Sequence, residues 1–318
     1  MESVLAIDIG GTKVDVGLVT FGGHIISRDR ILTLEASEGS LYKRILEIAH
    51  KEVAKADTPP RAIGIGCGGP GKDAYNLVSP LNIAQWRDFP LRQKIELIAK
   101  KALKISKVKL QDLDAISATA GPGLLVCLSV GFNFAKALAL AEGWLGAAKN
   151  DTNFIAMVVS TGIGGGIVLN GNLLEGAEGN AGHIGHVFVQ QDIGEDALGV
   201  VGLLEGAASG SGLARRFGIE PYNVSQQVRQ ETGVLVGRAI ASVANLLDLQ
   251  LAVVSGSVAF GFGNDFFNAA QKTINELTKI EHSRGTLVTP GALGEEGPLI
   301  GAAAVALRKM GKEILTQS

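Results

Sequence analysis

The sequence has few cysteines and no concentration of charge of one sign. Only Cys67 and Cys127 occur among 318 residues. They are too few for a zinc site built from cysteines, and their apolar, glycine-rich surroundings favour buried thiols over a disulfide. Lysine and arginine number 29 against 31 aspartates and glutamates, with no basic block. Proteins that bind nucleic acid usually carry a clustered positive patch, so we expect no nucleic-acid partner.

The sequence also lacks a signal peptide and an uninterrupted apolar span. Residues 1–9 have neither the basic start nor the long apolar core of a secretory signal. Residues 115–135 carry no charge, but Gly121-Pro122-Gly123 interrupts them, which favours a buried strand, loop and helix over a membrane span. We therefore expect a cytoplasmic protein with no membrane partner.

Two strand–turn–strand patterns stand out in a chain long enough for two domains. The apolar run 4–7 ends at Asp8-Ile9-Gly10-Gly11-Thr12-Lys13 and resumes at 14–19. The run 154–159 ends at Ser160-Thr161-Gly162-Ile163-Gly164-Gly165-Gly166 and resumes at 167–169. A strand follows each turn, which argues against a Rossmann unit, and the first turn lacks the Lys-Ser/Thr of a P-loop. The repetition predicts a duplicated α/β fold with two lobes.

These glycine turns are suited to binding phosphate groups. Without Cβ atoms the backbone N–H groups can approach an anion closely. Asp8, at a strand end, is suited to hold a hydrated Mg²⁺, and Thr12 and Thr161 add hydroxyl donors. A single glycine turn is more often an ordinary hairpin, but two matched turns favour a nucleotide site.

The two turns resemble the phosphate motifs of the ROK family, which includes glucokinases, N-acetylhexosamine kinases and sugar-responsive repressors. The resemblance covers about residues 3–98 and 142–310. It implies an α/β, actin-like ATPase (ribonuclease H-like) duplicated two-lobe fold. The N-terminal lobe would be 1–135, completed by a C-terminal helix at 300–318, and the C-terminal lobe 136–299. ROK repressors carry a helix-turn-helix domain ahead of the first phosphate motif, which begins here at Asp8, so we expect the kinase branch.

The resemblance implies ATP-dependent phosphorylation of a hydroxyl of glucose or an N-acetylhexosamine, with Mg²⁺, by a homodimer or other homo-oligomer. The residues it assigns to ATP are Asp8, Gly10, Gly11, Thr12, Lys13, Thr161, Gly162, Gly164, Gly165, Ser255 and Gly256. The residues it assigns to the sugar are Gly69, Asn82, His183, His186 and Glu205. Asp8 would hold Mg²⁺ through water. A structural histidine at 186 and a solvated carboxylate at 205 are the alternatives for those two positions.

The sugar and zinc motifs of the family are altered. The family's Glu-x-Gly-His motif is His183-Ile184-Gly185-His186 here, and imidazole brings no fixed negative charge to sugar hydroxyls. The family usually has a Cys-x-Cys-Gly-x-x-Gly-Cys-x-Glu run that binds structural zinc together with that His. Asp196, Leu198 and Leu203 stand at the three Cys positions. One His with one Asp is a poor tetrahedral site, so we expect no structural zinc and apolar packing by the two leucines.

Residues 113–124 and 130–139 resemble a different family, the tRNA threonylcarbamoyl-transferases once called sialoglycoprotein endopeptidases, which share the actin-like ATPase fold. That family binds a metal through a His pair that should follow within some fifteen residues. No His occurs between His50 and His183. We therefore do not expect the tRNA-modifying chemistry.

The catalytic base is the remaining question. ROK kinases supply a carboxylate for the sugar hydroxyl proton from an Asn-Asp-x-Asn motif that opens a helix. Counting back without gaps from Ser160 puts that motif on residues 133–136, with Phe134 at the acidic position. Asn150-Asp151-Thr152-Asn153 has the right letters, although a polar turn is the simpler interpretation. Asp151 is the candidate base, and a catalytically inactive nucleotide- or sugar-binding relative is the alternative.

Overall fold

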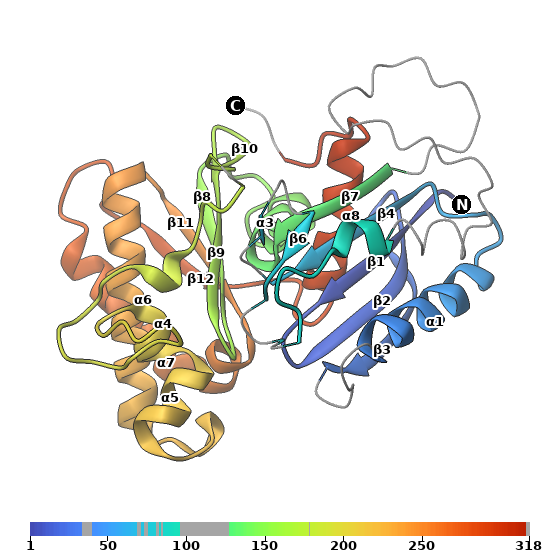
Figure 1. Cartoon of the computed structure of the whole chain (residues 1–318). Coiled ribbons are helices and arrows are strands. Elements are labelled where there is room, and N and C mark those ends of the chain that lie inside the picture. Colours follow the sequence, from blue (N-terminus) through green and yellow to red (C-terminus); the bar gives the residue numbers. More distant parts are fainter. Residues whose placement is uncertain are drawn as a thin grey trace. The chain divides into compact units, whose positions relative to one another are not determined.

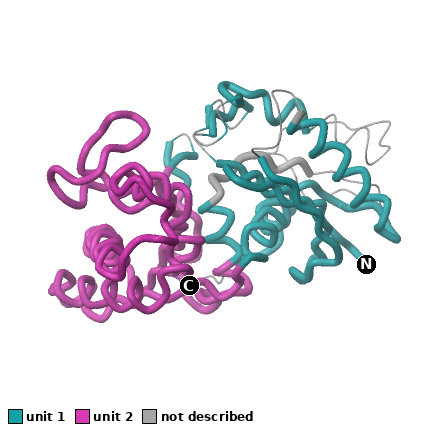
Figure 2. The backbone as a smooth tube through the Cα atoms, turned by 90° about the horizontal axis from the view of Figure 1, so that it is seen from below, with its two compact units in different colours: residues 1–141, 175–180, 295–314 teal, residues 142–174, 181–294, 315–318 magenta. Residues whose placement is uncertain are grey.

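The computed structural model describes residues 1–33, 40–68, 71–72, 76–80, 83, 85–95, 127–177 and 179–315 (Figure 1). The chain divides into two compact units, shown in teal and magenta in Figure 2. Unit 1 comprises 1–141, 175–180 and 295–314, and unit 2 comprises 142–174, 181–294 and 315–318. Within the described ranges, every helix is too short or too polar to cross a lipid bilayer.

Unit 1 is built on a five-stranded mixed sheet with the order β3-β2-β1-β4-β7. Its strands are β1 (Ser3–Ile9), β2 (Lys13–Thr20), β3 (Ile25–Leu32), β4 (Ala62–Cys67) and β7 (Cys127–Asn133). The first strand pairs antiparallel with β2 and parallel with β4, which pairs parallel with β7. All seven residues of β1 are buried, as expected for a strand that is covered on both faces.

Helices cover both faces of this sheet. Leu5 and Ile7 of β1 pack in one cluster with Leu41 and Ile45 of α1 (Ser40–Ala54). Alternate residues of a strand point to opposite faces, and the other face packs against α8 (Gly297–Lys309). A Cβ atom at Gly64 of β4 would lie 2.0 Å from the carbonyl oxygen of Ala302, so the absent side chain lets α8 lie directly on the strand.

The described part of unit 1 contains further elements. The helix α3 (Phe134–Leu145) begins directly after β7 and continues past the boundary between the units. A small two-stranded sheet pairs β5 (Gly71–Lys72) with β6 (Leu77–Val78).

Unit 2 repeats the sheet of unit 1. Its order is β10-β9-β8-β11-β12. The strands are β8 (Phe154–Val159), β9 (Ile163–Leu169), β10 (Asn172–Leu173), β11 (Leu251–Ser255) and β12 (Leu287–Pro290). β8 pairs antiparallel with β9 and parallel with β11, and β11 pairs parallel with β12. The same order and the same strand directions occur in both sheets, which confirms the predicted duplication.

Helices of unit 2 form the rest of its core. They are the 3₁₀ turns η2 (Ile184–His186) and η3 (Pro221–Asn223) and the α-helices α4 (Leu204–Ala208), α5 (Gly210–Phe217), α6 (Gln226–Leu247) and α7 (Ser257–Leu277). α6 and α7 pack closely because a Cβ at Gly233 would lie 2.3 Å from the carbonyl oxygen of Phe266. The side chain of Ser225 caps α6 by accepting the N–H of Val228.

The lobe boundaries predicted from sequence differ from the bounds of the compact units. Residues 136–141, 175–180 and 295–299 cluster with unit 1, whereas 315–318 cluster with unit 2. The chain therefore passes between the units after residues 141, 174, 180, 294 and 314. The lobes 1–135 with 300–318 and 136–299 stay a prediction.

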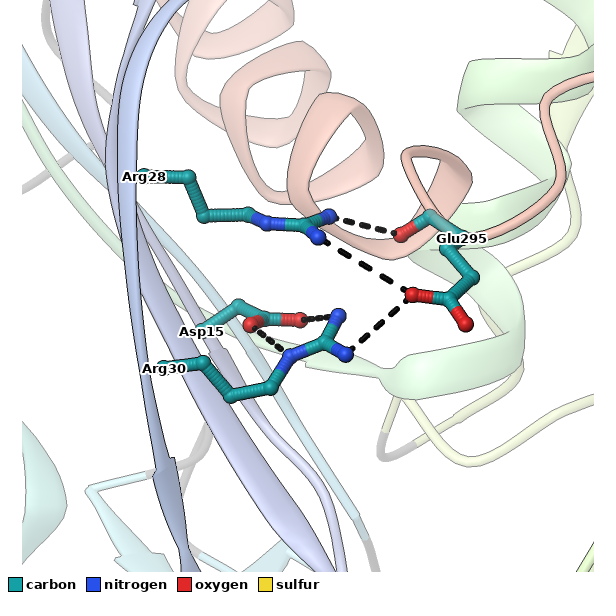
Figure 3. A network of polar contacts seen from close by, with 4 residues as sticks. All are labelled: Asp15, Arg28, Arg30 and Glu295. Carbon is teal, nitrogen blue, oxygen red and sulfur yellow. Dashed lines mark hydrogen bonds and ion pairs between the residues drawn. The ribbon is translucent and has the colours of Figure 1, made fainter.

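An ion network joins β2 and β3 to the residues that precede α8 (Figure 3). Asp15 on β2 is buried, and its oxygens accept two hydrogen bonds from Arg30 on β3, at 2.7 Å from Nε and 3.0 Å from Nη2. Nη1 of Arg30 lies 3.1 Å from Oε2 of Glu295, and Nη1 of Arg28 donates to the Glu295 carbonyl at 3.3 Å. Two parallel bonds to a buried carboxylate make the Asp15–Arg30 contact the strongest part of the network.

Substituting Arg30→Met should destabilise the protein because it leaves the Asp15 carboxylate buried without its partner. We expect a loss of about 2 kcal/mol in the free energy of unfolding, measured by urea denaturation. Arg28→Met is the matched control, since Arg28 contacts only the exposed Glu295 in this network, and should lose less than about 1 kcal/mol. Equal losses in the two variants would contradict the role assigned to Arg30.

Candidate active site

The first glycine turn joins β1 to β2 in unit 1. The N–H of Gly10 donates to the carbonyl oxygen of Lys13 at 2.9 Å, and a Cβ at Gly10 would lie 2.9 Å from the same oxygen. Thr33 holds the turn from its other side: its hydroxyl donates to the Gly10 carbonyl and its N–H to the Thr12 carbonyl, both at 2.9 Å. The turn is thereby fixed by its carbonyl groups, and the Thr12 residue is exposed.

Asp8 lies at the end of β1 beside this turn. Its carboxyl group is buried, and Oδ1 has no hydrogen-bond partner in the described part of the chain. Burial raises the pKa of Asp8 well above its usual range, and the negative charge of Asp15 adds to this, while Lys13 and Arg30 oppose it. A Cβ at Gly66 would lie 3.2 Å from Oδ1, so glycine leaves room for the carboxyl group. An unpartnered carboxyl oxygen next to a phosphate motif fits a hydrated Mg²⁺.

The second glycine turn joins β8 to β9 in unit 2, where the N-termini of two helices meet it. The carbonyl oxygens of Ser160 and Thr161 accept the N–H groups of Gly210 and Ser211, at 2.7 and 3.1 Å, at the start of α5. The hydroxyl of Ser160 lies 2.9 Å from that of Ser257, the first residue of α7. Helix N-termini carry partial positive charge, so the surroundings of Thr161 favour an anion.

The parallel pairing of β11 with β8 brings Ser255 and Gly256 to the same edge of the sheet. Ser255 pairs with Val158, and Gly256 follows with φ of 110°. A Cβ at Gly256 would lie 2.4 Å from the carbonyl oxygen of Val159, so both the backbone angle and the space require glycine. Thr161, Gly162, Ser255 and Gly256 are thus assembled at the carboxyl ends of β8 and β11.

The sugar-side residues assemble next to the second turn. Glu205, in the first turn of α4, accepts the backbone N–H of Ile163, the first residue of β9. Burial raises the pKa of Glu205, and the nearby His186 opposes this. The rings of His183 and His186 meet edge to face with centroids 5.9 Å apart. A Cβ at Gly185 would lie 2.6 Å from the Ile163 carbonyl oxygen, which explains glycine between the histidines.

Other predicted site residues fall in two groups. Gly164 and Gly165 lie in β9, opposite Val158 and Met157 of β8. A Cβ at Gly165 would lie 2.9 Å from the carbonyl oxygen of Gly182, so this glycine makes room for the loop that leads to His183. Gly69 and Asn82 lie outside the described residues.

The region that corresponds to the family's zinc motif is organised by a carboxylate. Asp196 is buried, and its Oδ1 accepts the N–H groups of Leu198 and Val200 at 2.8 and 2.9 Å. The expectation that Leu198 fills the space by apolar packing is wrong, because this residue is 68% exposed, and Leu203 is only half-buried. One carboxylate and two hydrocarbon side chains do not fit a tetrahedral zinc ion.

Asp151 is not brought to the second phosphate turn. It precedes β8, whereas Thr161 follows that strand, and the six residues of β8 span about 20 Å. Asp151 instead lines a hollow with Gln250, Leu251 and Leu287, at the amino ends of β11 and β12. The position that Phe134 occupies does open a helix, since α3 begins there.

Lys136 is a residue that the sequence reasoning missed. It is fully buried in α3, and its Nζ donates to the carbonyl oxygens of Glu175 and Gly179 at 2.9 and 2.8 Å. Burial lowers the pKa of Lys136 to about 8, with Arg308 contributing and Glu175 opposing. The available signal was a single lysine in an otherwise apolar helical stretch, 134–141.

Comparisons with known proteins match the same two families that the sequence resembles. The sequence profile of the ROK family matches residues 4–110 and 129–309. A second profile, described as tRNA N6-adenosine threonylcarbamoyltransferase, matches the short segment 91–144. The second match contains the predicted resemblance at 113–124 and 130–139, whereas the ROK match extends beyond the predicted 3–98 and 142–310 to include residues 99–110 and 129–141.

Characterised relatives and solved structures agree with the first match. A glucokinase of Halalkalibacterium halodurans is 31% identical over 280 residues, which cover 84% of this chain and 76% of the relative. An N-acetylmannosamine kinase of Yersinia pestis is 30% identical over 297 residues, 88% of this chain and 92% of the relative. A ROK family glucokinase from Streptomyces griseus, solved with glucose and AMPPNP, superposes with a TM-score of 0.73 at 26% identity, covering 96% of this chain and 99% of that one. These likenesses confirm the predicted actin-like ATPase fold.

The buried ammonium of Lys136 should give stability a distinctive pH dependence. Its pKa in the folded protein, about 8, lies below the ordinary lysine value of 10.5, so the unfolded chain binds more protons between these values. Stability due to this residue therefore rises with pH across that window. We expect the difference in unfolding free energy between wild type and Lys136→Met to change in favour of wild type from pH 8 to about pH 10.5. The exposed Lys149→Met is the control, and a flat or falling difference for Lys136→Met would refute the assignment.

Proposed function

The chain belongs to the ROK family, and we propose on that basis that it is an ATP-dependent sugar kinase. It transfers the γ-phosphoryl group of ATP to a hydroxyl of glucose or an N-acetylhexosamine. The observation that carries the proposal is the assembly of His183, His186 and Glu205 directly against the phosphate turn at Ile163. We place the reaction in the cytoplasm, where ATP is supplied, and we expect a homodimer or other homo-oligomer.

In the proposed complex, both glycine turns bind the phosphate groups of one nucleotide. Gly10, Gly11, Thr12 and Lys13 contribute from unit 1, and Thr161, Gly162, Gly164, Gly165, Ser255 and Gly256 contribute from unit 2. The start of α7 beside Ser160 adds partial positive charge. Asp8 would hold Mg²⁺ through water, and this ion, when bound, neutralises charge on the transferred phosphoryl group.

The sugar binds to His183, His186 and Glu205, with Gly69 and Asn82 proposed from sequence alone. Glu205 accepts hydrogen bonds from sugar hydroxyls with an oxygen that its contact to Ile163 holds in place. His183 occupies a position where a carboxylate is usual in the family, so it supplies a neutral donor or acceptor instead. We therefore expect the choice among hexoses to differ from that of relatives that carry the carboxylate.

Removal of the proton from the sugar hydroxyl is the step for which this site is least well equipped. Phosphoryl transfer depends mainly on positioning and electrostatic stabilisation, so the reaction proceeds without a dedicated base, but more slowly. General-base catalysis typically contributes about 10²–10⁴-fold. Asp151, the carboxylate predicted from sequence, precedes β8 and does not reach the phosphate turn. Phenylalanine at position 134 is also the observation that favours a second candidate function, a nucleotide- or sugar-binding relative without catalysis.

The direct test is ADP release by the purified chain with Mg·ATP and a panel of glucose, mannose, N-acetylglucosamine and N-acetylmannosamine. We expect turnover with at least one hexose and a sugar phosphate of the correct mass. Binding of ATP in calorimetry without turnover on any hexose would favour the non-catalytic candidate. Absence of binding of both ATP and every hexose would contradict both candidates.

Restoring a carboxylate at the start of α3 should accelerate the reaction. Phe134→Asp places a proton acceptor at the first residue of that helix, and we expect kcat to rise by about 10²-fold or more. Phe134→Asn is the matched control, because it has the same shape without a basic carboxylate. Equal kcat values for the Asp and Asn variants would contradict the interpretation.

A further inference from the structure

The loop that replaces the family's zinc motif is organised around the Asp196 carboxylate. Besides the two N–H groups that reach Oδ1, the backbone N–H of Asp196 donates to the carbonyl of Val200 at 3.0 Å. Glu195 and Val201 form an antiparallel bridge that closes the same hairpin. A residue 6% exposed is thus fixed in both its backbone and its carboxylate, and the loop needs no metal ion to hold its shape.

The second oxygen of the Asp196 carboxylate, Oδ2, lies near a residue outside the loop. Oδ2 is buried and has no hydrogen-bond partner within the described ranges. It lies 3.9 Å from Nε2 of His186, whose side chain is 34% exposed. A buried carboxylate oxygen without a donor is costly, and an imidazole N–H is the kind of donor that satisfies it.

Two further titratable residues lie near His186. His183 precedes it on the turn that contains η2, and their rings are in contact. Glu205 approaches from α4 and interacts electrostatically with His186, and Arg215 on α5 also acts on Glu205. Asp196 is therefore the carboxylate that reaches Nε2, while Glu205 is bound to the N–H of Ile163.

We propose that Asp196 is a positioning residue for sugar binding. Its Oδ2 accepts the Nε2–H of His186, which fixes the tautomer of the imidazole and leaves Nδ1 as an acceptor for a sugar hydroxyl. The proposal rests on the proposed function, in which His186 contacts the sugar. In metal sites a carboxylate that accepts the N–H of one ring nitrogen fixes the tautomer and orientation of a histidine, and Asp196 would act on His186 in the same way.

Asp196→Asn tests the proposal with little disturbance of the loop. Asparagine keeps the Oδ1 acceptor for Leu198 and Val200, but its NH₂ group cannot accept a hydrogen bond from His186. We expect the KM for the sugar to rise about tenfold, with the KM for ATP and the melting temperature unchanged and kcat altered less than twofold. Nitrogen-15 NMR of the unliganded protein should show His186 shift away from the Nε2–H tautomer.

Asp192→Asn is the matched control, since Asp192 is an exposed carboxylate in the same loop with φ of 56°, a conformation that asparagine tolerates. It should leave sugar KM, tautomer and stability as in wild type. In a double-mutant cycle, Asp196→Asn should add no further loss of sugar affinity once His186 is alanine.

Two results would overturn the proposal: an unchanged tautomer and sugar KM in Asp196→Asn, or a parallel rise in the KM for ATP and sugar with a lower melting temperature. The NMR measurement needs no substrate, so it stands even where the kinase activity itself is not found. Failure of the proposed function would instead show as an absence of phosphoryl transfer by the wild-type protein.

Discussion

The pairing of Asp8 with Asp15 across β1 and β2 is the constraint on which the first half of the site depends. Two buried carboxyl groups so close repel one another unless positive charge or a proton intervenes. Arg30 supplies the charge for Asp15 through two hydrogen bonds, and burial keeps the pKa of Asp8 high. The result is an Asp8 carboxyl oxygen beside the glycine turn that has no hydrogen-bond partner among the described residues. A cation bound there would compensate the charge of the carboxylate and of a nucleotide phosphate together.

In unit 2 the phosphate turn and the sugar-side residues form one hydrogen-bonded assembly. Glu205 binds the N–H that follows the turn, and α5 begins on the carbonyl groups of Ser160 and Thr161. A change in the sugar-side helix α4 is therefore transmitted to the backbone that would contact the nucleotide. If the proposed sugar and nucleotide sites are correct, these contacts offer a short path between them.

The repeated strand–turn–strand pattern was predictable from sequence because apolar strands and glycine turns are local signals. The Asn-Asp-x-Asn letters at residues 150–153 could not place Asp151, because a four-letter motif does not say at which end of a strand it will lie. The exposure of Leu198 could not be predicted from sequence. Asp196 closes the hairpin by accepting the backbone N–H groups of Leu198 and Val200, and composition does not reveal contacts to the backbone. Lys136 escaped notice because its acceptors lie 39 and 43 residues away in the chain.

Lys136 and Arg308 both contact the segment 175–180. Lys136 donates to the backbone carbonyl of Glu175, and Nη1 of Arg308 donates to Oε1 of the Glu175 side chain at 3.2 Å. That segment clusters with unit 1, although the residues on either side of it cluster with unit 2. Neither half of the protein can consequently be obtained by cutting the polypeptide once. A fragment starting at residue 142 would carry segment 175–180 and α8 without the strands and the lysine that receive them, so excised pieces of this kinase should be prone to misfolding and to association through those orphaned surfaces.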